Sequence, residues 1–218
     1  MWADFPLALV FLAAVIYLVR FAVDGSSLPL FAVFLAMLPW VKREGLILAA
    51  VLATALVWIA FQAGKAGRLP LALLPLVVVS CGWSIFLHSV HASADHDFVP
   101  VSFTTAAQNV GRLPFIFSAM GLELLAVVRW TVFWPLAVVA AFHVIWTRSL
   151  ARWRLLPLIM VALLALYAGI YIFSAWPSLT LHLVTSVPRL LLPVAMPALL
   201  LIAVAVPSWR GARMPAQE

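Results

Sequence analysis

Long apolar runs alternate with short polar breaks along the chain, and this pattern predicts membrane-spanning helices. A helix needs about 20 apolar residues to cross a bilayer, and most of the runs approach that length. We therefore expect an all-α, polytopic integral membrane protein that forms one transmembrane domain over residues 1–218. Seven spans are expected, at residues 5–23, 28–41, 46–63, 69–87, 131–146, 155–175 and 190–206.

Residues 88–130 depart from this pattern. They begin with the sequence HSVHASADHD, and from Ser102 onward polar side chains interrupt the apolar residues. Such mixing is typical of amphipathic helices that lie at a membrane surface. We expect residues 88–130 to form an outer loop with interfacial helices rather than a further span.

The composition excludes a soluble domain. Hydrophobic residues make up 67% of the 218 residues, charged residues only 9%, and the mean hydropathy is +1.17. A soluble domain carries charge on roughly a quarter of its residues. The net charge of +6 lies in short loops between apolar runs, so we ascribe it to membrane topology and expect no nucleic-acid partner. The single cysteine, Cys81, excludes an internal disulfide.

The distribution of charge predicts the orientation, because short loops rich in Lys and Arg stay in the cytoplasm. If the basic loops at residues 64–68 and 147–154 and the C-terminal tail are cytoplasmic, the inner face carries eight of the 13 basic residues. Five of the seven acidic residues then lie on the outer face. We expect a protein of the inner (plasma) membrane, with its N-terminus outside and its C-terminus in the cytoplasm.

An N-terminus outside is difficult to insert without a signal peptide or a preceding span. No basic segment precedes the first apolar run, and Asp4 stands in front of it, so the start does not read as a signal peptide. We therefore expect the chain to be the C-terminal part of a longer protein, or to work with a partner subunit that supplies a missing N-terminal half.

Three short motifs, at residues 2–8, 40–45 and 186–193, place charged residues next to predicted spans. The first, WADFPLA, resembles the Asp-x-Pro-Leu-Ala stretch that opens a mid-protein span in GT-C membrane glycosyltransferases. The second, WVKREG, is similar to their Trp-x-Lys-x-Glu-Gly turn. The third, SVPRLLLP with Pro197 after it, is similar to their final helix.

The resemblance covers most of the chain, with the motifs in family order. The superfamily includes the protein mannosyltransferases and the aminoarabinose lipid A transferases. The resemblance implies transfer of a sugar from a polyprenyl-phosphate donor on the periplasmic or luminal face. The acidic catalytic loop of the family precedes the region matched here, which agrees with the expectation of a missing N-terminal half.

Four residues are candidates for binding the donor phosphate. Lys42 and Arg43 lie in the turn after the second span, while His182 and Arg189 are seven positions apart and can share one face of a helix. Cations form strong charge-assisted hydrogen bonds with a phosphate where little water competes. The alternative for the cations is snorkelling toward lipid headgroups.

Asp4 is a candidate catalytic residue, because the resemblance places it beside the donor phosphate or a metal. It also stands where a helix N-cap is expected, a position that favours a short acceptor side chain. One residue can do both.

Imidazoles and carboxylates are dense in the loop at residues 88–97. His88, His91, Asp95 and Asp97 are candidate ligands for a divalent, zinc-like metal, the only cofactor that the sequence suggests. His91 and His96 are also candidates for a catalytic base or for positioning an acceptor, because histidine titrates near neutral pH. The alternative is a solvated surface loop.

The leading hypothesis is a GT-C-like glycosyltransferase, or its C-terminal part, whose partners are a lipid-linked sugar donor and the bilayer. Two other hypotheses remain open. The chain is a non-catalytic membrane subunit or a truncated remnant of that fold, or it is a small transporter or metal-handling protein that uses the His/Asp loop. A transporter needs polar residues at mid-bilayer in several spans, and the sequence has almost none.

Overall fold

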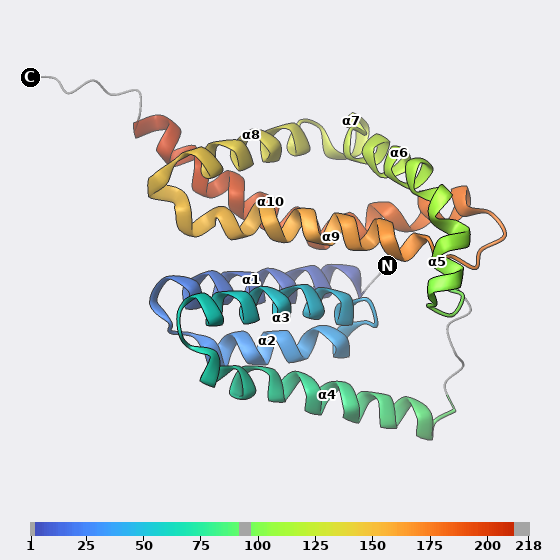
Figure 1. The fold of residues 1–218 in the computed structure, drawn as a ribbon. Coiled ribbons are helices and arrows are strands. Elements are labelled where there is room, and N and C mark those ends of the chain that lie inside the picture. Colours follow the sequence, from blue (N-terminus) through green and yellow to red (C-terminus); the bar gives the residue numbers. More distant parts are fainter. Residues whose placement is uncertain (1–2, 92–96, 212–218) are drawn as a thin grey trace, which may run out of the picture.

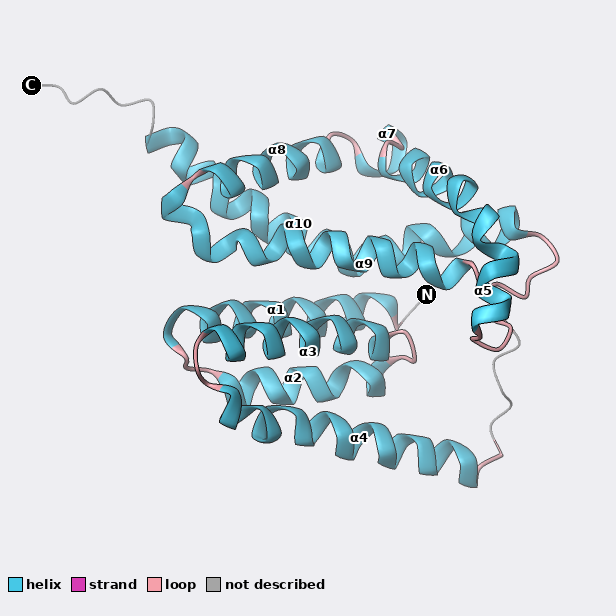
Figure 2. Ribbon diagram, viewed as in Figure 1, coloured by secondary structure: helices cyan, strands magenta, loops and turns pink. Residues whose placement is uncertain are grey.

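The computed structural model describes residues 3–91 and 97–211, and these residues are almost entirely helical (Figures 1 and 2). The only β-type contact in these two ranges is an isolated bridge between Phe98 and Ser174. The α-helices are α1 (Asp4–Asp24), α2 (Leu28–Val41), α3 (Gly45–Gln62), α4 (Leu69–Ser89), α5 (Phe103–Asn109), α6 (Leu113–Leu124), α7 (Val127–Trp130), α8 (Phe133–Trp146), α9 (Leu155–Tyr171) and α10 (Leu179–Gly211). Three short 3₁₀ segments are η1 (Ala66–Arg68), η2 (Val110–Arg112) and η3 (Arg148–Arg154).

The all-α class expected from the sequence is confirmed, and several helices are of membrane-spanning length. Five helical segments of the described chain are long and apolar enough to cross a bilayer: Asp4–Asp24, Gly45–Gln62, Ala66–Ser89, Arg148–Tyr171 and Leu179–Val206. α2 and α8 are apolar but have only 14 residues each. At about 1.5 Å per residue they are shorter than a bilayer core of about 30 Å. The seven-span count therefore stays a prediction.

The helices form two layers (Figure 1). One layer holds α1 to α4, with α4 on its outer side, and the other holds α9 and α10 with the arch of α5 to α8. The layers meet where α1 packs against α10 and α3 packs against α9. On α1, the fully buried residues Ala8, Phe11, Val15 and Leu18 recur every three or four positions, so one helical face supplies this contact.

Turns and helix ends collect at two opposite ends of the molecule (Figure 1). One end holds the start of α1, the α2–α3 turn, the end of α4 and the α9–α10 connection. The other end holds the α1–α2 turn together with the basic segments η1 and η3. Asp4 and the α2–α3 turn thus lie at the opposite end of the molecule from η1 and η3.

The segment that we expect at the membrane surface forms α5, α6 and α7, and α6 packs against α9 and α10. α5 begins at a true helix cap, because the hydroxyl of Ser102 accepts the backbone N–H of Thr105 at 3.1 Å. Large apolar side chains stay uncovered here, including Phe103 at 90% exposure and Val128 at 100%. Such exposure is costly in water but is accommodated by lipid.

α10 begins at Leu179, earlier than the expected start of the last span at residue 190. The hydroxyl of Ser178 accepts the N–H of Leu181 at 3.2 Å and so satisfies one free donor of the first turn. The polar residues Thr185 and Ser186, which precede the expected span, lie within this helix. Thr185 and Ser186 direct their hydroxyls back to carbonyls of the preceding turn, which lets a helix hold them in an apolar setting.

Candidate functional site

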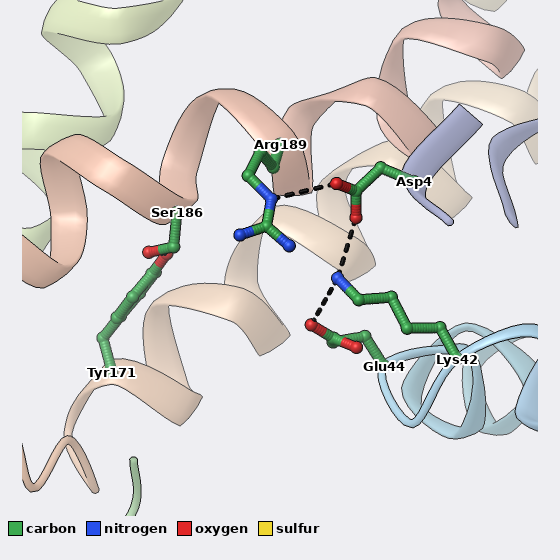
Figure 3. Close-up of polar contacts among 6 residues, drawn as sticks. All are labelled: Asp4, Lys42, Glu44, Tyr171, Ser186 and Arg189. Carbon is green, nitrogen blue, oxygen red and sulfur yellow. Dashed lines mark hydrogen bonds and ion pairs between the residues drawn. The ribbon is translucent and has the colours of Figure 1, made fainter. Parts of the chain in front are cut away.

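Asp4 is the meeting point of three segments that are distant in sequence (Figure 3). Its carboxylate accepts from Lys42 Nζ at 2.7 Å and from Arg189 Nε at 2.9 Å, so each oxygen is paired with a different cation. Lys42 also pairs with Glu44 at 2.7 Å. Asp4 is only 7% exposed, and a carboxylate buried to this extent needs charged partners.

The helix-cap interpretation of Asp4 is wrong. Ala3 occupies the N-cap position of α1, and no side chain caps this helix end. Asp4 is instead the first residue of the helix, where a negative charge also interacts favourably with the helix dipole. Its side chain is used for tertiary contacts rather than for the local backbone.

The tight α2–α3 turn fixes the position of Lys42. Gly45 lies directly against α2: a Cβ built on it would be 1.9 Å from the carbonyl oxygen of Leu38 and 3.1 Å from Leu7. Only glycine permits this close approach. The sequence Lys42-Arg43-Glu44-Gly45 therefore bends back immediately after α2, and this bend turns Lys42 toward Asp4.

A cavity of about 560 Å³ opens beside this cluster. It brings together all four residues that the sequence assigns to phosphate binding, Lys42, Arg43, His182 and Arg189, and it adds Asp97. The other polar lining comes from Glu44 and from aromatic and hydroxyl side chains of α9, α10 and their connection: Tyr167, Tyr171, Trp176, Thr185 and Ser186. A concave site with a few convergent polar groups is typical of ligand pockets.

Arg189 presents hydrogen-bond donors to this cavity. It contacts Asp4 through Nε, and its two terminal nitrogens extend away from Asp4 (Figure 3). Those two nitrogens make no hydrogen bond to any described residue. The two terminal nitrogens, called here the outer fork, are therefore available to donate to a ligand, and their spacing matches that of two phosphate oxygens.

His182 is held rigidly at the cavity wall. Its Nδ1 lies 2.7 Å from the hydroxyl of Ser174, and the indole of Trp176 stacks on the ring at 4.7 Å. The Ser174 hydroxyl also accepts the backbone N–H of Trp176. The direction of the Ser174–His182 bond depends on the imidazole tautomer, because a serine hydroxyl can both donate and accept. These contacts fix the orientation of the ring at the cavity wall.

Two tyrosines of α9 differ sharply in their partners. The Tyr171 hydroxyl lies 2.6 Å from the Ser186 hydroxyl, which in turn donates to the carbonyl of His182 (Figure 3). The Tyr167 hydroxyl is buried and has no hydrogen-bond partner within the described chain. An unpaired buried hydroxyl is costly, about 1–3 kcal/mol, and Tyr167 belongs to the cavity lining, so its hydroxyl is a candidate contact for a ligand.

Asp97 anchors the segment that covers the cavity. It accepts from the indole nitrogen of Trp176 at 2.9 Å, and its backbone carbonyl accepts the N–H of Ala175 at 2.9 Å. The backbone N–H of Val99 donates to Phe173 at 2.8 Å. These bonds attach residues 97–99 to the α9–α10 connection. Asp97 thereby holds the indole of Trp176 in its position stacked on His182.

The structure does not bring the candidate metal ligands together where it describes them. His88 and His91 are exposed at the end of α4, which lies apart from the α9–α10 connection where Asp97 is bound (Figure 1). No group of three His, Cys, Asp or Glu side chains within residues 3–91 and 97–206 has the arrangement of a metal site. Asp95 and His96 fall outside the described residues, so the catalytic and metal assignments that include them stay predictions.

Sequence reasoning missed Tyr167 and Ser174. Tyr167 and Tyr171 are four positions apart in an otherwise apolar helix, and that spacing was a usable signal for a polar face. Ser174 had no comparable signal, since it lies at the end of a predicted span.

No family model, curated protein or solved structure matches the chain.

Proposed function

We propose that the cavity binds the phosphate of a polyprenyl-phosphate-linked sugar, and that the chain is a GT-C-like membrane glycosyltransferase or its C-terminal part. One observation carries this proposal. The three motifs that resemble that superfamily contribute Asp4, Lys42 and Arg189. Lys42 and Arg189 follow Asp4 by 38 and 185 positions, yet the three side chains form one hydrogen-bonded cluster at the cavity. Snorkelling toward lipid headgroups gives no reason for such convergence.

The cavity offers donors that suit an anion. The outer fork of Arg189 is a cationic donor, the Tyr167 hydroxyl is an uncharged one, and Lys42 adds a second positive charge. In the proposed reaction an acceptor hydroxyl or amine attacks the anomeric carbon, and the bond between that carbon and the phosphate oxygen breaks. The lipid phosphate leaves with the electron pair, and Arg189 and Lys42 stabilise its added negative charge.

Asp4 serves this mechanism by position. Because both of its oxygens accept from cations, we assign it to holding Lys42 and Arg189 in place rather than to accepting a proton. Proton acceptance by His91 or His96 remains the sequence-based prediction.

The direct test uses the purified chain in lipid nanodiscs. Polyprenyl-phosphate-linked hexose is supplied with an extract of membrane lipids as acceptor, and released polyprenyl phosphate is measured. We expect binding and release above background, and loss of both in Arg189→Gln. A chain that binds neither polyprenyl phosphate nor its sugar-linked form contradicts the proposal.

A non-catalytic subunit that binds the same lipid is the second candidate. It is favoured by the full engagement of Asp4, because both of its oxygens are already paired with cations. The same assay separates the two functions: binding without release of polyprenyl phosphate identifies the subunit, while binding with release identifies the enzyme.

Tyr167→Phe provides a matched test of the cavity. The change removes an unpaired buried hydroxyl, so thermal stability should be unchanged or rise by up to about 1 kcal/mol, while affinity for polyprenyl phosphate should fall about 10-fold. Tyr171→Phe is the control, because it removes the bond to Ser186 and should lower stability by about 1 kcal/mol. An unaltered affinity in Tyr167→Phe would remove that hydroxyl from the site.

The membrane arrangement that we propose has seven spans, in which α2 and α8 also cross, with the Asp4 end outside and the η1 and η3 end in the cytoplasm. Its support is the gathering of η1 and η3 at one end of the molecule (Figure 1) together with the preference of basic loops for the cytoplasm.

Single cysteines placed in a Cys81→Ala background test this orientation. Ser178→Cys, in the α9–α10 connection, should react with an impermeant maleimide added to intact cells, while Gly67→Cys, in η1, should react only after the cells are permeabilised. Labelling of both positions from the same side contradicts the arrangement.

A further inference from the structure

The end of the molecule opposite Asp4 contains a hollow of about 570 Å³ between the two helical layers (Figure 1). Its lining comes from α1 and α3 of one layer and from α8, η3 and α9 of the other. Arg152 and Arg154 of η3 are the only charged residues among its described lining, and the other nine lining residues are apolar. The hollow shares no lining residue with the polar cavity, so it is a separate candidate site.

The two arginines of this hollow have no acidic partner. Both are exposed, and neither makes a hydrogen bond or an ion pair with a described residue. Arg152 lies over the ring of Trp153 at 5.6 Å, a contact that orients the guanidinium without neutralising its charge. Arg68 of η1 differs, because it donates to the carbonyl of Gly25 at 3.2 Å. Arg152 and Arg154 therefore keep their hydrogen-bond donors for a ligand.

Positive charge is in excess around the hollow. Residues 20–24, 65–68 and 148–154 hold six basic residues and one acidic residue, Asp24. Asp24 accepts the backbone N–H of Ser26 and does not line the hollow. The described chain thus supplies no counter-charge there. An anionic group in the hollow would meet two guanidinium groups, whose planar forks match the geometry of phosphate oxygens.

The hollow continues into an apolar one of about 330 Å³, because Trp58, Leu155 and Leu158 line both. Together they extend over residues 50–59 of α3 and 155–166 of α9, which rise about 14 and 17 Å at 1.5 Å per residue. One leaflet of a bilayer core is about 15 Å deep, half of about 30 Å. The apolar part therefore matches the length of one acyl chain of an ordinary phospholipid.

The side of the hollow is open to the surroundings of the helices. Trp58 is 54%, Leu158 is 53% and Val161 is 63% exposed. A lipid can therefore enter from the bilayer without passing through the core of the protein.

We propose that this hollow binds an anionic diacyl phospholipid of the leaflet at the η1 and η3 end. Its phosphate contacts Arg152 and Arg154, and one acyl chain lies between α3 and α9. In the membrane arrangement proposed above this is the cytoplasmic leaflet, where basic pockets between membrane helices bind anionic headgroups. Because the hollow is lined from both layers, the lipid would also hold the layers together and raise thermal stability.

The test is native mass spectrometry of the purified full chain in detergent with dioleoyl phosphatidylglycerol or dioleoyl phosphatidylcholine. We expect phosphatidylglycerol to bind about 10-fold more tightly or better, because only it carries a net negative charge. It should also raise the melting temperature, whereas phosphatidylcholine should not. Equal affinity for the two lipids overturns the inference. Glycerophosphoglycerol, the same headgroup without acyl chains, should not displace the lipid, and displacement at equal concentration overturns it as well.

The double variant Arg152→Gln/Arg154→Gln tests the headgroup contact and should weaken phosphatidylglycerol binding about 10-fold or more. Arg148→Gln is the matched control, because Arg148 is also an exposed arginine of η3 but does not line the hollow. It should stay within about 2-fold of the unaltered chain. Equal losses in the two variants would show general attraction to a basic surface and overturn the site.

Ala162→Trp tests the acyl contact while both arginines remain, so a double variant that fails to fold does not end the test. It fills the 330 Å³ hollow from α9 and should weaken phosphatidylglycerol binding about 5-fold or more, because several methylenes lose their contact. Val78→Trp is its control, because Val78 is 60% exposed on α4, which lies on the side of its layer away from α9 (Figure 1). Unchanged binding in Ala162→Trp refutes the acyl site.

This inference does not rest on the proposed function. Arg189→Gln should leave phosphatidylglycerol binding within about 2-fold, because Arg189 lines only the polar cavity and distant sites act independently. A loss equal to that of the double variant would place the phospholipid in the polar cavity and overturn the inference.

Discussion

Arg189→Gln should lower the affinity for polyprenyl phosphate by about 10- to 150-fold, the range that corresponds to losing a charge-assisted hydrogen bond of about 1.5–3 kcal/mol. The guanidinium is held by Asp4 through Nε, and its terminal nitrogens make no hydrogen bond to a described residue, so they are the donors a phosphate would use. Glutamine keeps a polar group of similar reach but removes the charge and the fork. Microscale thermophoresis on nanodisc-embedded protein measures the change.

Arg129→Gln is the matched control for this experiment. Arg129 is also an arginine in a carboxylate pair, with Glu123 at 3.0 Å, but it does not line the cavity. We expect its substitution to leave polyprenyl phosphate affinity within about 2-fold, because exposed pairs contribute little. Equal losses in the two variants would point to general electrostatic attraction to the protein and would exclude a specific phosphate contact at Arg189.

Asp4→Asn should lower the free energy of unfolding by about 1–3 kcal/mol. The amide is isosteric with the carboxylate but leaves Lys42 and Arg189 without the negative charge that now lies between them. The Arg189 side chain is 42% exposed, so water screens part of that pair, and we expect a loss in the lower half of the range. Thermal unfolding in detergent, followed by tryptophan fluorescence, measures it.

The other end of α1 supplies the control for Asp4. Asp24 is exposed and accepts the nearby backbone N–H of Ser26 at 2.7 Å, so Asp24→Asn should alter stability by no more than about 0.5 kcal/mol. A loss in Asp4→Asn that is no greater than in Asp24→Asn would show that the cluster does not stabilise the contact between α1 and α10.

The Asp4 variant also distinguishes the two roles of this carboxylate. If Asp4 only positions the cations, Asp4→Glu should retain part of the binding, because a carboxylate remains within reach of Lys42 and Arg189. A catalytic proton acceptor would tolerate neither substitution, and loss of sugar release with unchanged lipid binding in both variants would identify that role.

The phosphate-binding candidates illustrate how much of the site the sequence can predict. Lys42 and Arg43 stand out because they are charges next to an apolar span, and the spacing of His182 and Arg189 predicts a shared helical face. All four line the cavity. Tyr167 was missed although Tyr171 follows it four positions later, because the sequence does not show that the Tyr167 hydroxyl is buried without a hydrogen-bond partner among the described residues.

The sequence by itself determined the all-α class and the positions of most helices. This is a local property: in lipid every backbone polar group must be satisfied within its own segment, so an apolar run of sufficient length becomes a helix whatever its neighbours are. The approximate helix ends follow for the same reason, since charges and glycines interrupt the apolar runs.

The tertiary structure alone decided which helices meet. Most faces of these helices are apolar, so hydrophobic periodicity scarcely distinguishes a face that packs on another helix from a face that contacts lipid. The pairing of Asp4 with Arg189 and the packing of α3 against α9 depend on contacts between segments up to 185 residues apart. Such contacts arise from packing between whole helices, and no local pattern in the chain encodes them.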